Sequence, residues 1–287
     1  AGAAGAIVSV ADYAGTWQTN NLTVVPNGSE KIGGTSANVA LSTRGQSVTF
    51  IYVDSTQGWL NTMDSTSNVR ASSHVAATGG TESTCGDFKI HTFTGPGTLC
   101  VTAAGSPSGS TTFEYIVVAG GGGGGTENNS STSAGGAGAG GFRFASPSLS
   151  PATYPGKPLA APAGIAASVG AVPIVVGAGA AAPSSCSTAN SGSVSTFSSI
   201  TSAGGGAGGI GASPSPGGLR SGTTGGSGGG GVHANTGSAG NTPSVSPAQG
   251  TAGGPSGPVY LAGGGGGAIN CGAAGTPSAA GNGGDGA

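Results

Sequence analysis

The sequence predicts an all-β protein in which N-terminal β modules precede a glycine-rich domain of polyglycine-II-type helices with a few strands. Short apolar runs separated by turn residues, with no helix-period stretch between them, predict the β modules. Glycine makes up 49 of the 169 residues from Ala119 onward and often recurs at every third position. A repeat of three residues is that of the polyproline-II helix, so essentially no α-helix is expected.

Composition limits the function classes that the chain can have. Charged residues make up only 6% of the chain, and the formal net charge is −2. No basic run provides the electrostatic footprint of a nucleic-acid-binding surface. No stretch approaches the roughly 18 consecutive apolar residues that a membrane-spanning helix needs. We therefore expect neither a nucleic-acid partner nor membrane insertion.

Residues 1–66 form the first predicted β module, to which we assign attachment or assembly. Asn21–Val25 leads into an Asn-Gly turn signal, and Val48–Val53 is a β-branched and aromatic run. Trp17 and Trp59 are the two tryptophans of the chain and are expected to anchor the core of this module. The alternative is an exposed aromatic patch that docks a partner.

A connector over residues 67–80 precedes a second β unit, residues 81–118. Asp87–Phe93 alternates between two faces, a Gly-Pro turn follows, and Thr98–Thr102 is expected to pair back onto it. Thr111–Val118 supplies a third strand. The unit is therefore predicted to be a three-stranded meander that delivers the chain to the glycine-rich domain.

Residues 119–287 form the predicted glycine-rich domain. Only 20 of these 169 residues are Leu, Ile, Val or Phe, a composition typical of disorder because little apolar surface offsets the backbone entropy. The glycine spacing predicts order instead, since helices without Cβ atoms approach until their backbones hydrogen-bond to one another. Breaks in the spacing predict a bundle of short antiparallel helices joined by loops. We expect Gly120–Gly125 to be the first helix and to lie in the middle of the bundle.

An apolar run precedes alanine- and glycine-rich sequence three times, as IVVAGGG, IVVGAGA and ITSAGGG. This weak repeat predicts that the same transition from strand to glycine helix is used three times. Pro173–Val176 and Val194–Ile200 are predicted to be strands or extended segments. They are expected to form a modest apolar core with Phe142, Phe144 and Ile174.

The loops between glycine helices are the candidate binding site, because binding residues usually lie on loops that a rigid scaffold positions. The loops are predicted at residues 126–134, 146–162, 183–194, 212–221, 232–249 and 255–261. The candidate contact residues are Asn128, Asn129, Tyr154, His233 and Tyr260. The alternative is that each of these residues only seals the end of a helix.

The sequence holds no catalytic, cofactor-binding or metal-binding constellation that we can identify. Residues 225–229 match the nucleophile-elbow pattern GxSxG around Ser227, but no predicted strand precedes them. The three histidines are far apart, and His91 is expected to be a structural residue on a strand. The four cysteines form no CxxC pair and are interpreted as small core residues, with disulfides as the alternative. We therefore predict no enzyme activity and no cofactor.

Ala77–Gly125 resembles the glycine-rich domain of bacteriophage tail-fibre and related virion proteins. The motifs that carry the resemblance are TGGT, the run GDFKIHTFT and the ending EYIVVAGGGGG. Phe197–Gly209 and the glycine-rich close at Gly281–Gly286 look similar as well. Residues 15–60 look like a β module of phage structural proteins.

The resemblance implies a polyglycine-II sandwich like that of tail-fibre tip adhesins, carried on the exterior of the virion. It implies that the loops touch a bacterial surface receptor, either an outer-membrane protein or a glycan. It also implies that the N-terminal module binds other fibre or tail subunits, and it leaves a homotrimer open. No individual contact residue transfers, because these loops differ among family members. The alternative functions are a capsid decoration or head fibre and, disfavoured by the interrupted glycine spacing, an ice-binding protein.

Overall fold

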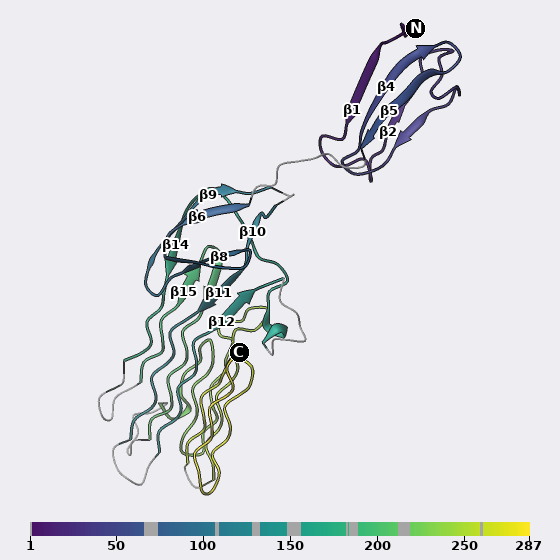
Figure 1. Ribbon diagram of the computed structural model, residues 1–287. Coiled ribbons are helices and arrows are strands. Elements are labelled where there is room, and N and C mark those ends of the chain that lie inside the picture. Colours follow the sequence, from purple (N-terminus) through teal and green to yellow (C-terminus); the bar gives the residue numbers. More distant parts are fainter. Residues whose placement is uncertain are drawn as a thin grey trace. The chain divides into compact units, whose positions relative to one another are not determined.

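The computed structural model describes residues 2–65, 74–106, 109–127, 133–147, 156–181, 183, 189–211, 219–258 and 261–287. The chain folds as two compact units, Ala1–Ala71 and Ser72–Ala287. The described residues contain strands and two short 3-10 turns, η1 (Lys157–Leu159) and η2 (Leu219–Ser221), but no α-helix (Figure 1). This composition of elements confirms the predicted all-β class. No helix in these ranges is long and apolar enough to cross a membrane.

The N-terminal unit packs a three-stranded antiparallel sheet against a hairpin. The sheet has the order β1 (Ile7–Ala11), β4 (Ser47–Asp54) and β5 (Gly58–Ser65), and the hairpin pairs β2 (Leu22–Val24) with β3 (Val39–Leu41). Alternate residues of β4 point inward, so Val48 and Phe50 form the core together with Leu41. Trp17 and Trp59 pack against this cluster, as core anchors would.

Asp12 is a buried carboxylate directly after β1. The backbone N–H groups of Thr16, Trp17 and Gly45 donate to its two oxygens at 3.0, 3.2 and 2.9 Å. Burial by itself raises the pKa of Asp12, but these backbone hydrogen bonds outweigh burial, and the net effect is a pKa below the usual value. The folded N-terminal unit therefore favours the charged form of Asp12.

We expect the stability of the N-terminal unit to fall in acid as Asp12 is protonated. Because its folded pKa lies below the unfolded value of about 3.9, the carboxylate stabilises the fold fully above that value. This contribution is lost as the pH falls through the folded pKa. The advantage of wild type over Asp12→Asn in unfolding free energy should therefore shrink between neutral pH and strong acid. Both tryptophans lie in this unit, so their fluorescence follows its unfolding, and a pH-independent difference would contradict the assignment.

The C-terminal unit contains a five-stranded antiparallel sheet and three separate strand pairs. The sheet has the order β16 (Ile200–Ser202), β15 (Ser195–Phe197), β14 (Gly170–Val175), β9 (Gly97–Ala104) and β6 (Val75–Thr78). The pairs are β7 (Thr81–Cys85) with β8 (Phe88–Thr92), β10 (Thr112–Phe113) with β13 (Ile165–Ala166), and β11 (Tyr115–Val118) with β12 (Phe142–Ala145). Two buried apolar clusters hold these strands together, one of Ala77, Leu99, Val101 and Ile174 and one of Tyr115, Val117 and Ala145.

The predicted three-stranded meander is wrong in its pairing. β8 does not pair with β9 but forms a tight hairpin with β7 across Gly86 and Asp87, and Gly86 has a φ of 56°. β9 pairs instead with β6 and β14. The reason is apolar burial, since Leu99 and Val101 of β9 meet Ile174 of β14 in one core, whereas β8 is almost entirely exposed.

The division into parts also differs from the expected one. β6 lies within the expected connector of residues 67–80, because Val75 and Ala77 contribute to the core. The expected boundary between residues 118 and 119 is not a domain boundary. β10 and β11 pair with β13 and β12, which come from the glycine-rich half, so both halves belong to one unit.

Strands of the C-terminal unit continue directly into extended, glycine-rich stretches, which we call glycine segments (Figure 1). The described glycine segments are residues 119–126, 134–141, 177–181, 189–194, 203–211, 227–232, 235–240, 250–257, 261–267, 271–276 and 280–286. β11, β14 and β16 each lead into one of them. These are the three transitions that the repeat IVVAGGG, IVVGAGA and ITSAGGG predicts, and the prediction is confirmed.

Backbone hydrogen bonds at every third residue join neighbouring glycine segments. Residues 134–141 donate to an antiparallel neighbour through Gly135 to Gly209, Gly138 to Gly206 and Gly141 to Ala203, each at 2.8 Å. Residues 203–211 in turn donate to a parallel neighbour through Gly205 to Gly120, Gly208 to Gly123 and Gly211 to Thr126, each at 2.9 Å. The period of three is the predicted one. The expectation of purely antiparallel neighbours is corrected, because a segment that bonds on several sides meets neighbours of both directions.

The middle of the bundle is not formed by Gly120–Gly125, as predicted. Residues 203–211, 227–232 and 262–267 are buried throughout, whereas Gly124 is exposed and Gly121 is half-buried. The first glycine segment has hydrogen-bonded neighbours on part of its circumference, and Gly124 faces open space. An absence of side chains permits burial on every side, but the position of a segment in the bundle decides how many sides are used.

Candidate functional site

The bundle of glycine segments has two chemically different ends. At the strand end, Ala119 donates to Gly141 and Phe142 donates to Gln249, directly below β11 and β12. At the opposite end, hydrogen bonds link Gly125 to Gly135, Gly135 to Gly209, Gly209 to Gly230, Gly231 to Gly254 and Gly275 to Pro255. We call this opposite end the loop end, because the chain reverses there between segments (Figure 1).

The turn at Val232–Asn235 is the best-defined part of the loop end. His233 and Ala234 have left-handed φ values of 52° and 62°. The side-chain amide of Asn235 donates to the carbonyls of Val232 and His233 at 3.0 Å each. Ala234 N–H donates to the hydroxyl of Ser256 at 2.6 Å, and Ser256 N–H donates to Asn235 O at 3.0 Å. These bonds fix the turn against the neighbouring segment.

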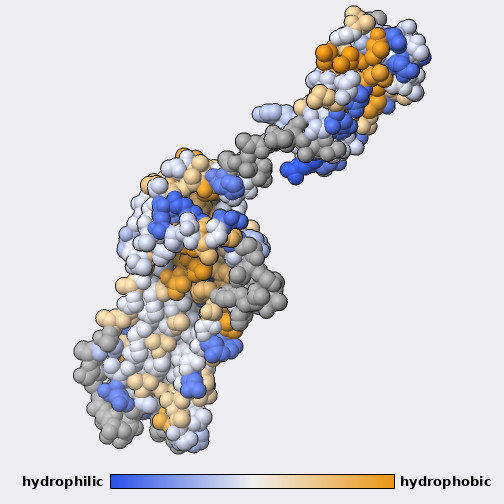
Figure 2. Space-filling model, in the orientation of Figure 1, coloured by the Kyte–Doolittle hydropathy of each residue, from blue (hydrophilic) through white to orange (hydrophobic). Residues whose placement is uncertain are grey.

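A second described turn of the loop end joins residues 271–276 to residues 280–286. Thr276 N–H donates to Ala279 O at 2.8 Å, and Ala279 N–H donates to the Thr276 hydroxyl at 3.0 Å. Every residue from Thr276 to Ala279 is exposed. The loop end therefore presents small, uncharged side chains on a closed backbone turn. Figure 2 shows mostly pale, near-neutral surface over the glycine segments.

The structure describes one of the five predicted contact residues. His233 lies in the loop-end turn, half-buried, with its Nε2 atom buried. This position suits the alternative role of sealing the end of a segment. Asn128, Asn129, Tyr154 and Tyr260 lie outside the described residues.

The predicted loop of residues 232–249 is corrected. Residues 235–240 form a glycine segment, in which Ser238 N–H donates to Gly229 O and Gly253 N–H donates to Ser238 O, both at 2.9 Å. The chain thus makes a turn at the loop end, crosses the bundle and makes a separate loop, residues 241–249, at the strand end. Glycine and small residues at every third position indicate the glycine segment at residues 235–240. The proline- and serine-rich sequence around this segment favoured the interpretation of the whole stretch as a loop.

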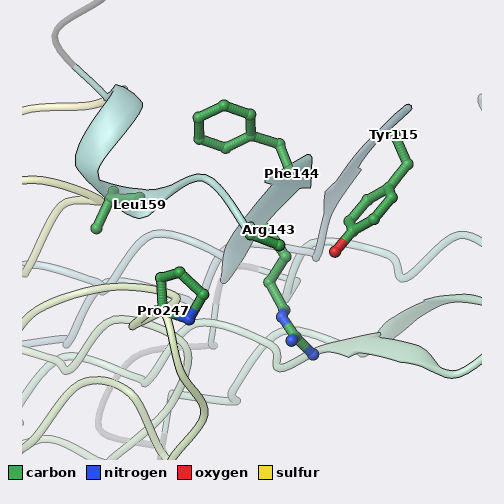
Figure 3. Close-up of a pocket in the computed structure, with 6 residues that line it drawn as sticks. Tyr115, Arg143, Phe144, Leu159 and Pro247 are labelled. Carbon is green, nitrogen blue, oxygen red and sulfur yellow. The ribbon is translucent and has the colours of Figure 1, made fainter. Parts of the chain in front are cut away.

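A shallow depression lies at the strand end, between the strands and the bundle (Figure 3). It is lined by Tyr115, Arg143, Phe144, Leu159, Ala161 and Pro247, which enclose no space large enough for a water molecule. Arg143 and Phe144 point in opposite directions, as neighbours in β12 must. Arg143 Nη1 donates to Thr201 O at 3.2 Å, and burial raises the pKa of Tyr115 despite the nearby Arg143 charge. The depression is a packing seam and not a ligand site.

Ser227, at the centre of the GxSxG match, is fully buried. Its hydroxyl donates to the Gly267 carbonyl at 2.9 Å and so links two glycine segments. The described residues contain no group of three or more His, Cys, Asp or Glu side chains placed to hold a metal ion. His91, predicted to be structural, lies in β8 with its Nδ1 2.8 Å from Gly79 O.

The interpretation of the cysteines as core residues is corrected for those that the structure describes. Cys85, Cys100 and Cys271 are free thiols and exposed. Cys100 lies opposite Ala171 and Thr78, on the outward face of β9, because Leu99 and Val101 take the inward positions. Cys186 lies outside the described residues.

The comparison with known families agrees with this architecture. A family model described as a glycine-rich domain matches residues 94–287. No match to a curated protein was found. The matched range covers β9 to the end of the chain, and so includes the paired strands β9 to β16 together with the described glycine segments. Because it spans more than half of the sequence, the chain belongs to the glycine-rich domain family.

Proposed function

We propose that the chain is a non-enzymatic virion protein of a phage tail fibre or tip, and that the loop end recognises a receptor on the bacterial surface. One observation carries the proposal: a hydrogen-bonded bundle holds the turns Val232–Asn235 and Thr276–Ala279 at the end opposite to the strands. Loops on such a scaffold are free to vary in sequence while the bundle of glycine segments keeps its geometry. In this proposal the N-terminal unit binds other virion subunits.

The chemistry of the loop end supports a neutral receptor surface. The exposed side chains of its second described turn are two hydroxyls, a proline and an alanine, at Thr276, Ser278, Pro277 and Ala279. Hydroxyls on closed turns offer directed hydrogen bonds at little entropic cost, because the backbone is already fixed. An outer-membrane protein or a neutral glycan provides matching groups.

Attaching the same bulky polymer at either end of the last glycine hairpin tests the proposal. Cys271 lies at the strand end, since Gly267 N–H donates to Asn270 O there, and Ser278 lies at the loop end. With the other cysteines replaced by serine, polyethylene glycol on Ser278→Cys should weaken binding of the full chain to bacterial cells at least tenfold, about 1.4 kcal/mol. The same polymer on Cys271 should not. Equal weakening from both positions, or no binding of the folded chain to any strain of a diverse panel, contradicts receptor binding at the loop end.

A capsid decoration or head fibre is the second candidate. The division into two units favours it, because the N-terminal unit would dock on a shell while the glycine-rich unit acts as a spacer. Density for the chain on the head in a map of the virion would support this candidate, and density at the tail tip would remove it.

A further inference from the structure

We propose that Asn27 is a site of spontaneous deamidation in the N-terminal unit, and that the hydrogen-bonded bundle of glycine segments protects Asn282 from the same reaction. Asn is followed by Gly at these two positions of the chain, Asn27-Gly28 and Asn282-Gly283. Glycine offers the least hindrance to attack by its own backbone nitrogen, because it carries no Cβ. The reacting Asn-Gly dipeptide is thus the same at both sites, and the surrounding structure separates them.

The reaction needs only water and hydroxide. Hydroxide takes the proton of the Gly28 backbone nitrogen, which attacks Cγ of the Asn27 side chain and forms a new C–N bond. The side-chain nitrogen takes a proton from water and leaves as ammonia, so that a five-membered succinimide ring remains. Water then breaks one of the two C–N bonds of the imide and gives aspartate or isoaspartate. No atom changes its oxidation state, and the unit gains one negative charge.

The turn at Asn27 leaves the reacting atoms accessible and movable. Asn27, Gly28 and Ser29 are all exposed. Gly28 has a φ of 60°, and no atom lies within 4 Å of the position of a Cβ there. The backbone bond that closes the turn runs from Glu30 N–H to Asn27 O, at 3.1 Å. Ring closure therefore requires the opening of one long hydrogen bond in a solvated turn.

Asn282 is held in place on both sides. Its carbonyl accepts from Ala273 N–H at 2.8 Å, Gly281 N–H donates to Ala262 O at 2.8 Å, and Gly284 N–H donates to Gly265 O at 2.9 Å. Asn282 and Gly283 are exposed, as Asn27 and Gly28 are. Rotation of the 282–283 peptide toward the side chain nevertheless breaks the bond from Ala273 and strains the flanking bonds of Gly281 and Gly284 to residues 261–267. Reaction at Asn282 must therefore proceed through local opening of the bundle.

Deamidation at Asn27 acts on the contact that holds Trp59. Glu30, three residues away, accepts from Trp59 Nε1 at 2.8 Å and from the backbone N–H of Gly2. The hydrogen bond from Trp59, followed by that from Gly2, lowers the pKa of Glu30. An isoaspartate lengthens the backbone by one methylene between β2 and Glu30 and adds a carboxylate three residues before Glu30. Ageing at Asn27 should therefore loosen the packing of Trp59 and destabilise the N-terminal unit.

The test is peptide mapping by mass spectrometry of the full chain aged at mildly alkaline pH. Modification at Asn27 should accumulate faster as the pH rises. Modification at Asn282 should be at least tenfold slower, a factor that corresponds to about 1.4 kcal/mol of local opening. In denaturant the two rates should converge. Equal rates at the two sites in the folded chain, or an Asn27 that stays intact while the unfolded chain reacts, overturn the proposal.

Two pairs of variants separate the causes. A Cβ on Gly284 would lie less than 3.0 Å from Asn270 O, whereas one on Gly286 meets no atom within 4 Å. Gly284→Ala should speed the reaction at Asn282 alone, and Gly286→Ala should leave that reaction slow. An unchanged rate in Gly284→Ala contradicts protection by the bundle of glycine segments.

The second pair of variants lies at Asn27. Asn27→Gln should abolish the age-dependent shift in tryptophan-monitored unfolding, and Asn27→Asp should reproduce only the part of the shift that is due to charge. A shift that persists in Asn27→Gln contradicts the assignment to Asn27.

Discussion

Gly122→Ala is expected to destabilise the glycine-rich unit by about 3 kcal/mol, while Gly124→Ala, in the same segment, should be neutral or slightly stabilising. A Cβ on Gly122 would lie less than 3.0 Å from the carbonyl oxygens of both Gly206 and Gly205. Those oxygens belong to backbone that its own hydrogen bonds hold, so relief requires separating two segments, an overpacking cost at the upper end of the usual range of about 1–3 kcal/mol. Gly124 has no atom within 4 Å of its Cβ position and is exposed. There alanine only reduces the entropy of the unfolded chain, worth about 0.4–1 kcal/mol.

Hydrogen exchange followed by mass spectrometry measures this contrast. Amides of residues 119–126 and 203–211 should lose protection in Gly122→Ala and keep it in Gly124→Ala. The tryptophan-monitored unfolding of the N-terminal unit should be unchanged in both variants, because neither glycine belongs to it. Equal exchange in the two variants would show that the segments are loosely packed, and would contradict a bundle held by close backbone contacts.

The sequence predicts elements better than it predicts their partners. The transitions at the ends of β11, β14 and β16 are visible as apolar runs followed by glycine, because both signals are local. The pairing of β9 with β14 is not visible, since the two strands are far apart in sequence and their match depends on burying Leu99 and Val101 against Ile174. The Gly-Pro turn between β8 and β9 favoured a hairpin of these two strands. The burial of apolar side chains between β9 and β14 outweighs this local preference.

The same limit applies to the candidate site. Glycine at every third residue predicts that segments associate, but it carries no information on which segment lies beside which, because every glycine face is alike. The exposed side of Gly124 and the burial of residues 203–211 follow from neighbours that only the fold defines. The reversal of the chain at Val232–Asn235 is indicated locally by Asn235, because its short amide side chain hydrogen-bonds to the backbone of its own turn.

Gln249 is a structural residue that sequence reasoning missed. It lies in a stretch rich in proline and serine that reads as an exposed loop, yet it is 1% exposed. Its Oε1 accepts from Ala203 N–H at 2.7 Å, its Nε2 donates to Pro243 O at 2.9 Å, and its own carbonyl accepts from Phe142 N–H at 2.8 Å. One side chain therefore joins the strand-end loop to the start of the buried glycine segment 203–211. A single large amide in a domain of small residues is the signal that points to it.

Gln249→Leu should destabilise the glycine-rich unit by about 3 kcal/mol. Leucine has a similar size but leaves the N–H of Ala203 and the carbonyl of Pro243 without the amide, and each buried, unsatisfied group costs about 1–3 kcal/mol. Gln249→Glu keeps an acceptor for Ala203 but turns the donor toward Pro243 into a second acceptor. Burial should raise the pKa of the new carboxyl, so this variant should gain stability as the pH falls. Gln18→Leu makes the same change at an exposed position of the N-terminal unit and should leave the unfolding of the glycine-rich unit unchanged. Calorimetry of the wild type and the three variants measures the unfolding of the glycine-rich unit. If this unit is as stable in Gln249→Leu as in Gln18→Leu, the two hydrogen bonds of the Gln249 side chain do not hold the strand end together.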